Sequence, residues 1–180
     1  SLPKLHVLSD PAFRSLVVLG SLFAVALFSN AFIVLRAADA GFAAAAIPLL
    51  IMGMNLVFSA ASYPFGQWAD KTNPKTLLAV GIGILILADL VFAFLPAQWG
   101  VVIGIVLMGL HLGASQGIFS LLVAETAPKA ERASAFGIFG FASGLSAIAA
   151  GLLAGVLWDS VGPEATFLSG AVLALCAGVG

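Results

Sequence analysis

The sequence predicts an all-α polytopic membrane protein with six transmembrane helices. Hydrophobic residues make up 62% of the 180 residues and charged residues only 8%, whereas charged residues are roughly 25% of an ordinary soluble protein. The 7 basic and 8 acidic side chains provide neither the basic surface that nucleic acid requires nor the polar composition of a disordered chain. A single cysteine, Cys176, offers no metal cluster or disulfide framework, and we expect neither a metal nor another cofactor.

Charged residues divide the chain into apolar segments, which we compare with the roughly 20 residues that a helix needs to cross a bilayer. Five segments are long enough, and they span residues 13–35, 42–65, 77–95, 99–124 and 133–158. A sixth segment, 165–180, is shorter, so we expect a truncated last helix and a natural protein that continues beyond it. The predicted organisation is a cytoplasmic lead-in of residues 1–12, followed by a transmembrane unit of residues 13–180.

The basic residues predict the orientation, because cytoplasmic loops of membrane proteins are enriched in Lys and Arg. Six of the 7 basic residues fall on one side if the helices alternate: Lys4, Arg14, Lys71, Lys75, Lys129 and Arg132. We therefore expect that side, and the N-terminus with it, to be cytoplasmic. The exception is Arg36 at the outer end of the first segment, where it can form a solvated pair with Asp39.

Glycines at intervals of four predict the helix faces that pack closely, because small residues let helix backbones approach each other in lipid. One set lies in the fourth segment and two sets lie in the fifth: Gly109, Gly113 and Gly117, then Gly140 and Gly144, and Gly151 and Gly155.

Polar residues inside the apolar segments are candidates for function. Asn55, Ser59 and Ser62 form a narrow stripe on one helix face, which can line a water-filled path or bond a neighbouring helix. His111 and Gln116 point about 140° apart on a helix, so we do not expect them to hold the same ligand atom unless the helix bends. Asp89 is the acidic residue deep in a segment, either a proton site or a group kept protonated or hydrogen-bonded to another helix.

Residues 113–117 satisfy the pattern Gly-x-Ser-x-Gly around Ser115, with His111 four residues earlier. In serine hydrolases this motif acts on a sharp strand-to-helix turn that exposes the hydroxyl and builds an oxyanion hole. Here it lies in the middle of an expected helix, and we do not expect an enzyme.

The segment that joins the second and third helices, residues 66–75, resembles the signature loop of the major facilitator superfamily, Gly-x-x-x-Asp-Arg/Lys-x-Gly-basic-basic. Four positions match that pattern: Gly66, Asp70, Lys71 and Lys75. Asn73 stands at the second glycine, where Asn tolerates a left-handed turn, and Pro74 replaces one basic residue. The resemblance extends over nearly the whole chain and implies the carboxyl-terminal half of such a transporter, a six-helix bundle of 3+3 inverted repeats.

The resemblance also implies roles for particular residues. It implies a secondary active transporter of a small solute in the bacterial plasma (inner) membrane, working by alternating access as a symporter or antiporter, with the proton as candidate coupling ion. Its partners would be the solute, the lipid bilayer and the missing amino-terminal half or a second copy, and not nucleic acid. The implied substrate path is lined by Asn30, Asn55, Gln116 and His111, while Asp89 falls off it. The implied conformational-switch loop comprises Gly66, Asp70, Lys71, Lys75, Glu125 and Arg132, whose charged members would gather as a cytoplasmic cluster.

Two other functions remain compatible with the residues. The chain can be a six-helix carrier that homodimerises, or a membrane scaffold or receptor without transport. Because no basic residue lies deep in a segment and Asp89 falls off the path, the sequence favours an uncharged or amphipathic solute.

Overall fold

The computed structural model describes residues 6–27 and 30–179, and every regular element in these ranges is helical. A short 3₁₀ turn, η1 (His6–Ser9), precedes the first α-helix. The α-helices are α1 (Pro11–Ala26), α2 (Asn30–Asp39), α3 (Ile47–Ala69), α4 (Pro74–Phe94), α5 (Gln98–Thr126), α6 (Arg132–Ser160) and α7 (Pro163–Val179). The all-α prediction is therefore confirmed for the described residues.

The first predicted segment is two helices rather than one. α1 begins where the Asp10 carboxylate accepts a hydrogen bond from the Ala12 amide at 2.9 Å and Pro11 occupies the first helical position, a favourable start for a helix. It ends at Ala26, because Leu27 takes an extended backbone conformation with φ −88° and ψ 90°. Residues 28 and 29 lie outside the described ranges, and α2 then begins at Asn30.

Five helical stretches in the described chain are long and apolar enough to cross a membrane: Pro11–Asp39, Ile47–Ala69, Pro74–Phe94, Gln98–Thr126 and Arg132–Ser160. They correspond to the five long segments predicted from the sequence. The sixth predicted segment is an apolar helix as well, but it is shorter, at Pro163–Gly178.

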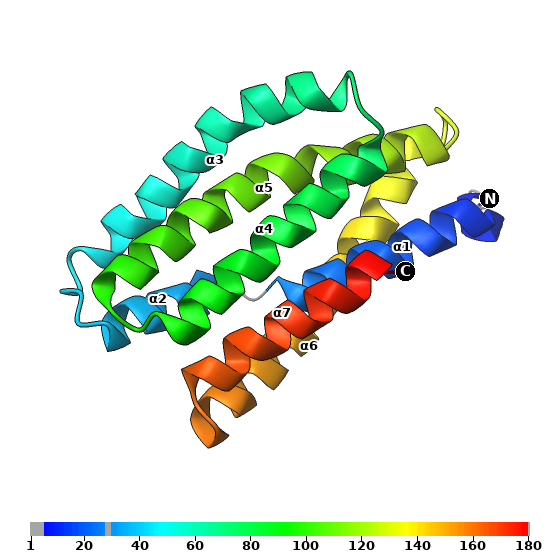
Figure 1. Ribbon diagram of the computed structural model, residues 1–180. Coiled ribbons are helices and arrows are strands. Elements are labelled where there is room, and N and C mark those ends of the chain that lie inside the picture. The colour runs from blue at the N-terminus through cyan, green and yellow to red at the C-terminus, as the bar shows by residue number, and fades with distance from the viewer. Residues whose placement is uncertain (1–5, 28–29, 180) are drawn as a thin grey trace.

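α4 and α5 form the centre of the bundle. α3 packs along α5, α7 packs along α4, and α1 lies against α6 and α7 (Figure 1). The largest fully buried apolar side chains come from several of these helices: Phe13, Phe92, Phe167, Met54, Leu77 and Leu85. α3 and α6 are the least covered long helices, with buried residues only at Met54 and Ala61 on α3 and at Ala135, Ala150 and Ala154 on α6.

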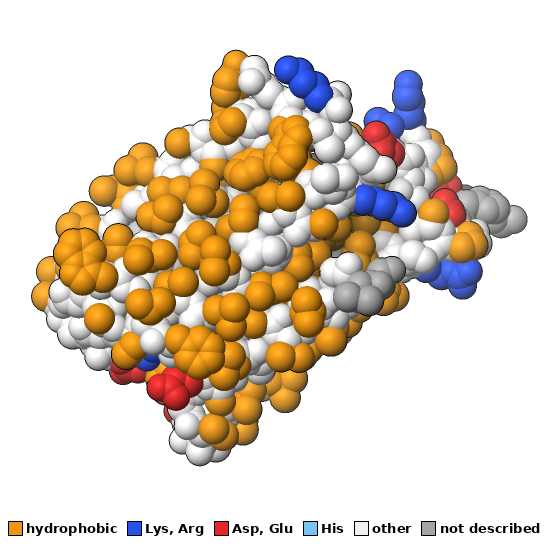
Figure 2. Space-filling model, viewed as in Figure 1, with side chains coloured by type: hydrophobic (Ala, Val, Ile, Leu, Met, Phe, Trp, Pro, Cys, Tyr) orange, Lys and Arg blue, Asp and Glu red, His pale blue; other side chains and the backbone are white. Residues whose placement is uncertain are grey.

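The connections between helices gather at two ends of the bundle. At one end the Gln98 side chain donates a hydrogen bond to the Gly41 carbonyl at 3.2 Å, which joins the α2–α3 and α4–α5 connections. Gly41 has φ +82°, a conformation that favours glycine. At the other end η1 and the α3–α4 and α5–α6 connections lie together, and most of the Lys and Arg side chains visible in Figure 2 surround them. The rest of the visible surface is largely apolar.

The glycine faces behave differently from one another. A Cβ atom at Gly109 would lie 2.7 Å from the Met54 carbonyl oxygen, and one at Gly113 would lie 2.8 Å from the Ala61 Cβ. The predicted close packing is therefore confirmed for these two residues, which face α3. The prediction of close packing is wrong, within the described chain, for five other glycines. A Cβ atom added at any of them would meet nothing within 4 Å: Gly117, Gly140, Gly144, Gly151 and Gly155. The reason for the last four is that much of α6 is uncovered.

Candidate functional site

A cleft of about 370 Å³ opens between three helices, and we call it the α1–α5–α6 cleft. Its lining consists of Gly20, Phe23, Ala24 and Leu27 from α1, His111, Leu112, Ser115, Gln116, Phe119 and Ser120 from α5, and Phe139 and Ser143 from α6. None of these described lining residues carries a full charge.

His111 is the polar centre of the cleft wall. Its side chain is fully buried, and Nδ1 lies 2.7 Å from the Gly81 carbonyl oxygen on α4. A carbonyl oxygen can only accept a hydrogen bond, so Nδ1 carries the hydrogen. In the neutral ring, Nε2 then carries a lone pair and is an acceptor.

Ser115 lies one helical turn from His111. Its hydroxyl donates to the His111 backbone carbonyl at 2.8 Å, and its Oγ lies 3.4 Å from His111 Nε2. A hydroxyl has one hydrogen, and the shorter contact uses it. Nε2 is therefore left without a well-placed donor from Ser115. The Gly-x-Ser-x-Gly pattern lies inside α5, as expected, with its hydroxyl bonded to its own helix.

Aromatic rings surround the imidazole. Phe23 stacks on His111 with ring centroids 5.4 Å apart and also lies 4.9 Å from the ring of Phe119. Phe119 in turn lies 5.9 Å from Phe139 of α6. Gly20 makes this arrangement possible, because an added Cβ atom there would overlap the Phe139 ring.

Other polar groups reach the same cleft. Gln116 and Ser120 are exposed, while the Ser143 Oγ atom is buried and has no hydrogen-bond partner among the described residues. His111 and Gln116 thus line one cleft. Because they point in different directions from α5, His111 is buried and Gln116 is exposed.

A second hollow, of about 480 Å³, lies between α3 and α5. Its lining brings Gly66 and Asp70 of the signature loop to Gln116 and Ser120 of α5, with Ser62 of α3 beside them. Gln116 and Ser120 line both hollows, so they connect the α1–α5–α6 cleft with the loop.

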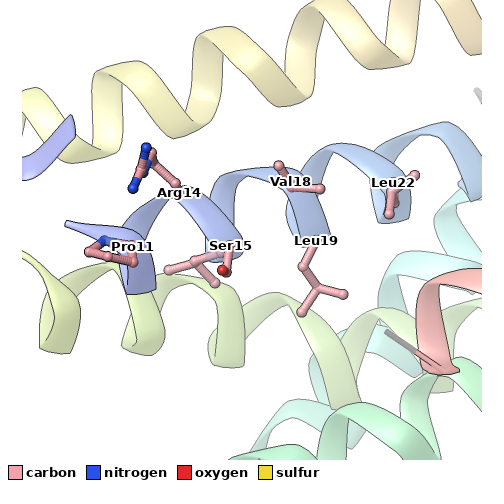
Figure 3. A pocket seen from close by; sticks show the side chains of 7 residues that line it. Pro11, Arg14, Ser15, Val18, Leu19 and Leu22 are labelled. Carbon is pink, nitrogen blue, oxygen red and sulfur yellow. The ribbon is translucent and has the colours of Figure 1, made fainter. Parts of the chain in front are cut away.

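A third hollow, of about 630 Å³, follows α1 toward its N-terminal end and includes Arg14, Leu19 and Leu22 in its lining. Figure 3 shows Arg14 on one side of α1 and Leu19 on the other. The lining of this hollow ends at Leu22, next to Gly20 and Phe23 of the α1–α5–α6 cleft, so the two hollows follow one another along the helix.

The two asparagines predicted to line a path lie outside both clefts. Asn30 is exposed at the first residue of α2. Asn55 is exposed on α3, and its side-chain amide donates to the Ile51 carbonyl of its own helix at 2.8 Å. In the same stripe, Ser59 is exposed and Ser62 donates to the Phe58 carbonyl at 2.7 Å. Within the described chain the stripe therefore does not bond a neighbouring helix.

The predicted switch residues lie near one end of the bundle but form no ion pair in the described part of the chain. All the charged residues among them are exposed: Asp70, Lys71, Lys75, Glu125 and Arg132. The departures from the signature pattern have a local structural role, because the Asn73 side chain caps α4 by accepting from the Lys75 amide at 2.9 Å and Pro74 begins that helix.

Sequence reasoning missed Glu131, which precedes α6. Its carboxylate accepts a hydrogen bond from the Val7 amide at 2.9 Å, although the two residues are far apart in the chain. Val7 is 1% exposed. This contact holds η1 against the α5–α6 connection, and no local sequence pattern marks it.

Arg36 corrects one expectation from the sequence, and Asp89 bears on another. Arg36 is 5% exposed, and its guanidinium donates to the Ala93 carbonyl on α4 at 3.3 Å, while Asp39 is exposed. The solvated Arg36–Asp39 pair was therefore wrong, because Arg36 lies on the inner face of α2. Asp89 is 2% exposed, and its Oδ2 atom has no hydrogen-bond partner among the described residues, so this oxygen does not bond a neighbouring helix.

Comparison with known proteins identifies the family to which the chain is similar. The family model described as the Major Facilitator Superfamily matches residues 15–180. An uncharacterized MFS-type transporter of Methanocaldococcus jannaschii is 31% identical over 169 residues, which cover 91% of this chain and 42% of that protein. The chain therefore spans less than half the length of the curated relative that it matches.

Proposed function

The chain belongs to the major facilitator superfamily, and from this premise we propose that it is the carboxyl-terminal half of a secondary transporter that moves a small solute by alternating access. The observation that carries the proposal is the match of almost the whole chain to 42% of a transporter's length. Membership in a family of transporters also argues against an enzymatic role.

The uncovered faces of α3 and α6 support a missing partner half. Asn55 and Ser59 are exposed on α3, and a Cβ atom added at any glycine of α6 would meet nothing within 4 Å in the described chain. Polar side chains facing lipid are costly, whereas a second half would cover them or enclose them in a water-filled path. In this proposal Asn30 and Asn55 belong to the wall that the two halves share, and Gln116 and His111 belong to the cleft behind it.

The signature loop supplies the proposed conformational switch. Asp70 is exposed, and its side chain lines the hollow that contains Gln116. We propose that Asp70, with Lys71, Lys75, Glu125 and Arg132, pairs with groups of the other half when the cytoplasmic side is closed. Breaking those pairs would let one half rock against the other and expose the site to the opposite side. The coupling ion in this proposal is a proton, in symport or antiport.

The orientation in this proposal has the N-terminus in the cytoplasm and the protein in the bacterial inner membrane. The basic end seen in Figure 2 supports it, because Lys and Arg favour the cytoplasmic side. The Lys71→Cys variant tests this orientation. Labelling of the introduced thiol by a membrane-impermeant reagent only from the cytoplasmic side would support it. Labelling from the other side would contradict it.

The proposed function is tested with the chain joined to its amino-terminal half in proteoliposomes, by following proton flux on addition of uncharged or amphipathic solutes. Asp70→Asn should abolish the solute-dependent flux while membrane insertion stays normal. Asp39→Asn is the matched control, because Asp39 is also an exposed carboxylate and lies at the opposite end of the bundle, and it should leave the flux intact.

Three results would contradict the proposal. Unchanged flux in Asp70→Asn would exclude the loop as the switch, and absence of flux in every variant would favour a scaffold or receptor. Accumulation of solute by the 180-residue chain alone would contradict the half-transporter, and sizing in detergent would then test for a homodimer of two copies.

A further inference from the structure

We propose that Asp89 is the proton-binding group of this half and that Arg36 responds to its ionisation. While Asp89 is protonated, the Arg36 guanidinium stays on the Ala93 carbonyl, where the structure places it. When Asp89 loses its proton, the guanidinium moves one helical turn along α4 and pairs with the carboxylate. This inference rests on the proposed transporter function, in which the proton is the coupling ion, and it names the group that takes the proton.

Asp89 lies inside the bundle among apolar side chains. It is 2% exposed, and its Oδ2 atom has no hydrogen-bond partner among the described residues. Its neighbours on the same buried side of α4 are Leu85, Phe92 and Ala93. An unpaired carboxylate in such a place is far more costly than a protonated carboxyl group. The arrangement in the structure therefore suits the protonated form, and the ionised form needs a cation beside it.

Arg36 is a buried cation on α2. It is 5% exposed, and a guanidinium stays charged in proteins. It donates to the Ala93 carbonyl at 3.3 Å, while its Nε atom is buried and has no partner in the described chain. Because the last carbonyls of a helix lack partners within it, this contact caps the C-terminal end of α4, beside which α2 lies in Figure 1. A carboxylate would be a stronger acceptor for the guanidinium than a carbonyl.

The two acceptors lie within one turn of each other. Asp89 and Ala93 are four residues apart on the same buried side of α4, which corresponds to about 6 Å along the helix axis. An arginine side chain can cover such a distance by changing its rotamers. The protonation of Asp89 thus decides which of two acceptors holds one guanidinium, and with it how α2 is attached to α4.

Among the described helices, Arg36 is the charged side chain available to Asp89 inside the bundle. The other titratable side chains of α2, of α4 and of the helices packed against α4 are exposed, apart from His111: Asp39, Tyr63, Lys75, Glu125, Glu164 and Cys176. His111 bonds the Gly81 carbonyl, eight residues before Asp89 on α4, which is about 12 Å away along the axis.

The proposed proton site lies apart from the clefts, so it acts through the helix that carries it. Neither Asp89 nor Arg36 lines the α1–α5–α6 cleft or the hollow between α3 and α5. However, α4 also carries the Gly81 carbonyl, which lies 2.7 Å from His111 Nδ1 in the cleft wall. On ionisation the O–H bond of Asp89 breaks, the proton passes to water, and Arg36 keeps all of its hydrogens. α4 therefore contacts both the proton site and the cleft.

Infrared spectroscopy of the full chain in lipid nanodiscs detects the proton directly. A protonated carboxyl group in apolar surroundings has a C=O band that disappears when the group ionises. We expect this band in the parent chain, its loss as the pH rises, and its absence in Asp89→Asn. Asp39→Asn is the matched control, because Asp39 is an exposed carboxylate, and it should leave the band in place.

Variants of Arg36 test the pairing. Arg36→Gln leaves the ionised carboxylate without a cation, so the band should persist to a proton concentration at least about tenfold lower than in the parent chain. Arg36→Lys keeps a cation and should titrate close to the parent. With isotope-labelled arginine, the guanidinium bands of the parent should change together with the carboxyl band, and this change should be absent in Asp89→Asn and Arg36→Gln. A structural role alone for Arg36 would not give this simultaneous change.

Three outcomes would overturn the inference. They are a carboxyl band that survives in Asp89→Asn, a band in the parent chain that does not respond to pH, and a band in Arg36→Gln that titrates as in the parent. Asp70→Asn separates this inference from the proposed function, because it should stop flux in the joined transporter and leave the infrared titration unchanged. Flux that persists in Asp89→Asn would contradict only this inference, and a normal titration without flux in any variant would contradict only the transporter.

Discussion

Replacement of Gly109 by Ala tests how closely α3 and α5 approach. The added Cβ atom would lie 2.7 Å from the Met54 carbonyl oxygen and 2.8 Å from the Val57 Cβ. Carbon atoms pack at about 3.5–4.0 Å, and one of these contacts is with backbone, so the helices must separate. Overpacking of this kind costs about 1–3 kcal/mol, while Gly→Ala within a helix contributes about 1 kcal/mol in the opposite direction.

Gly117→Ala is the matched control for this experiment. Gly117 lies two turns further along α5 in the same four-residue series, and an added Cβ atom there would meet nothing within 4 Å. Both variants gain the same helix propensity, so the difference between them isolates the contact with α3. We expect Gly109→Ala to have a free energy of unfolding about 1–3 kcal/mol below that of Gly117→Ala.

The assay is titration with sodium dodecyl sulfate in mixed micelles, followed by tryptophan fluorescence. Gly113→Ala should resemble Gly109→Ala, because its Cβ atom would lie 2.8 Å from the Ala61 Cβ and 3.3 Å from the Ser62 amide nitrogen. Equal stability of Gly109→Ala and Gly117→Ala would refute the close α3–α5 contact. A cost for Gly117→Ala alone would show that the helices meet elsewhere along the series.

Three further variants probe other contacts. Gly20→Ala should have a free energy of unfolding about 1–3 kcal/mol below that of Gly117→Ala, because the added Cβ atom would overlap the Phe139 ring and displace it; equal stability of the two variants in the detergent titration would show that α1 and α6 do not approach this closely. Glu131→Ala removes a hydrogen bond to a carboxylate, worth about 1.5–3 kcal/mol, so hydrogen exchange of the Val7 amide should become at least tenfold faster, and an unchanged rate would show that the contact does not hold η1. Asp89→Asn should raise the free energy of unfolding by about 1 kcal/mol or more, because a buried acidic group with an unpartnered oxygen is costly in a membrane; a lower value in the detergent titration would mean that Asp89 has a stabilising partner.

The long helices could be predicted from composition alone. Each of the five apolar segments became a helix or helix pair of membrane-spanning length, and the polar connections fell where charged and turn-forming residues cluster. The break after Ala26 was not predicted, because the first segment carries no Pro or Gly at that position to mark it. The loop of residues 66–75 could be related to its family from its residue pattern, and the match over residues 15–180 supports the same family.

The candidate site was less accessible to sequence reasoning. His111 and Gln116 could be singled out as polar residues of a membrane helix, but the Gly81 carbonyl that orients the imidazole comes from α4, and the Phe23 ring that stacks on it comes from α1. The Glu131–Val7 contact joins two connections at one end of the bundle and has no local signal either.

Local sequence determined which parts of this chain enter a membrane, since the transfer free energy of each residue adds along a segment and needs no knowledge of its neighbours in space. Tertiary structure alone decided the rotation of each helix about its axis. In lipid both the buried and the exposed faces are apolar, so hydropathy does not distinguish the face that packs from the face that meets lipid. For that reason Gly109 contacts α3 while Gly117 does not, and Arg36 turns inward to the Ala93 carbonyl instead of outward to water.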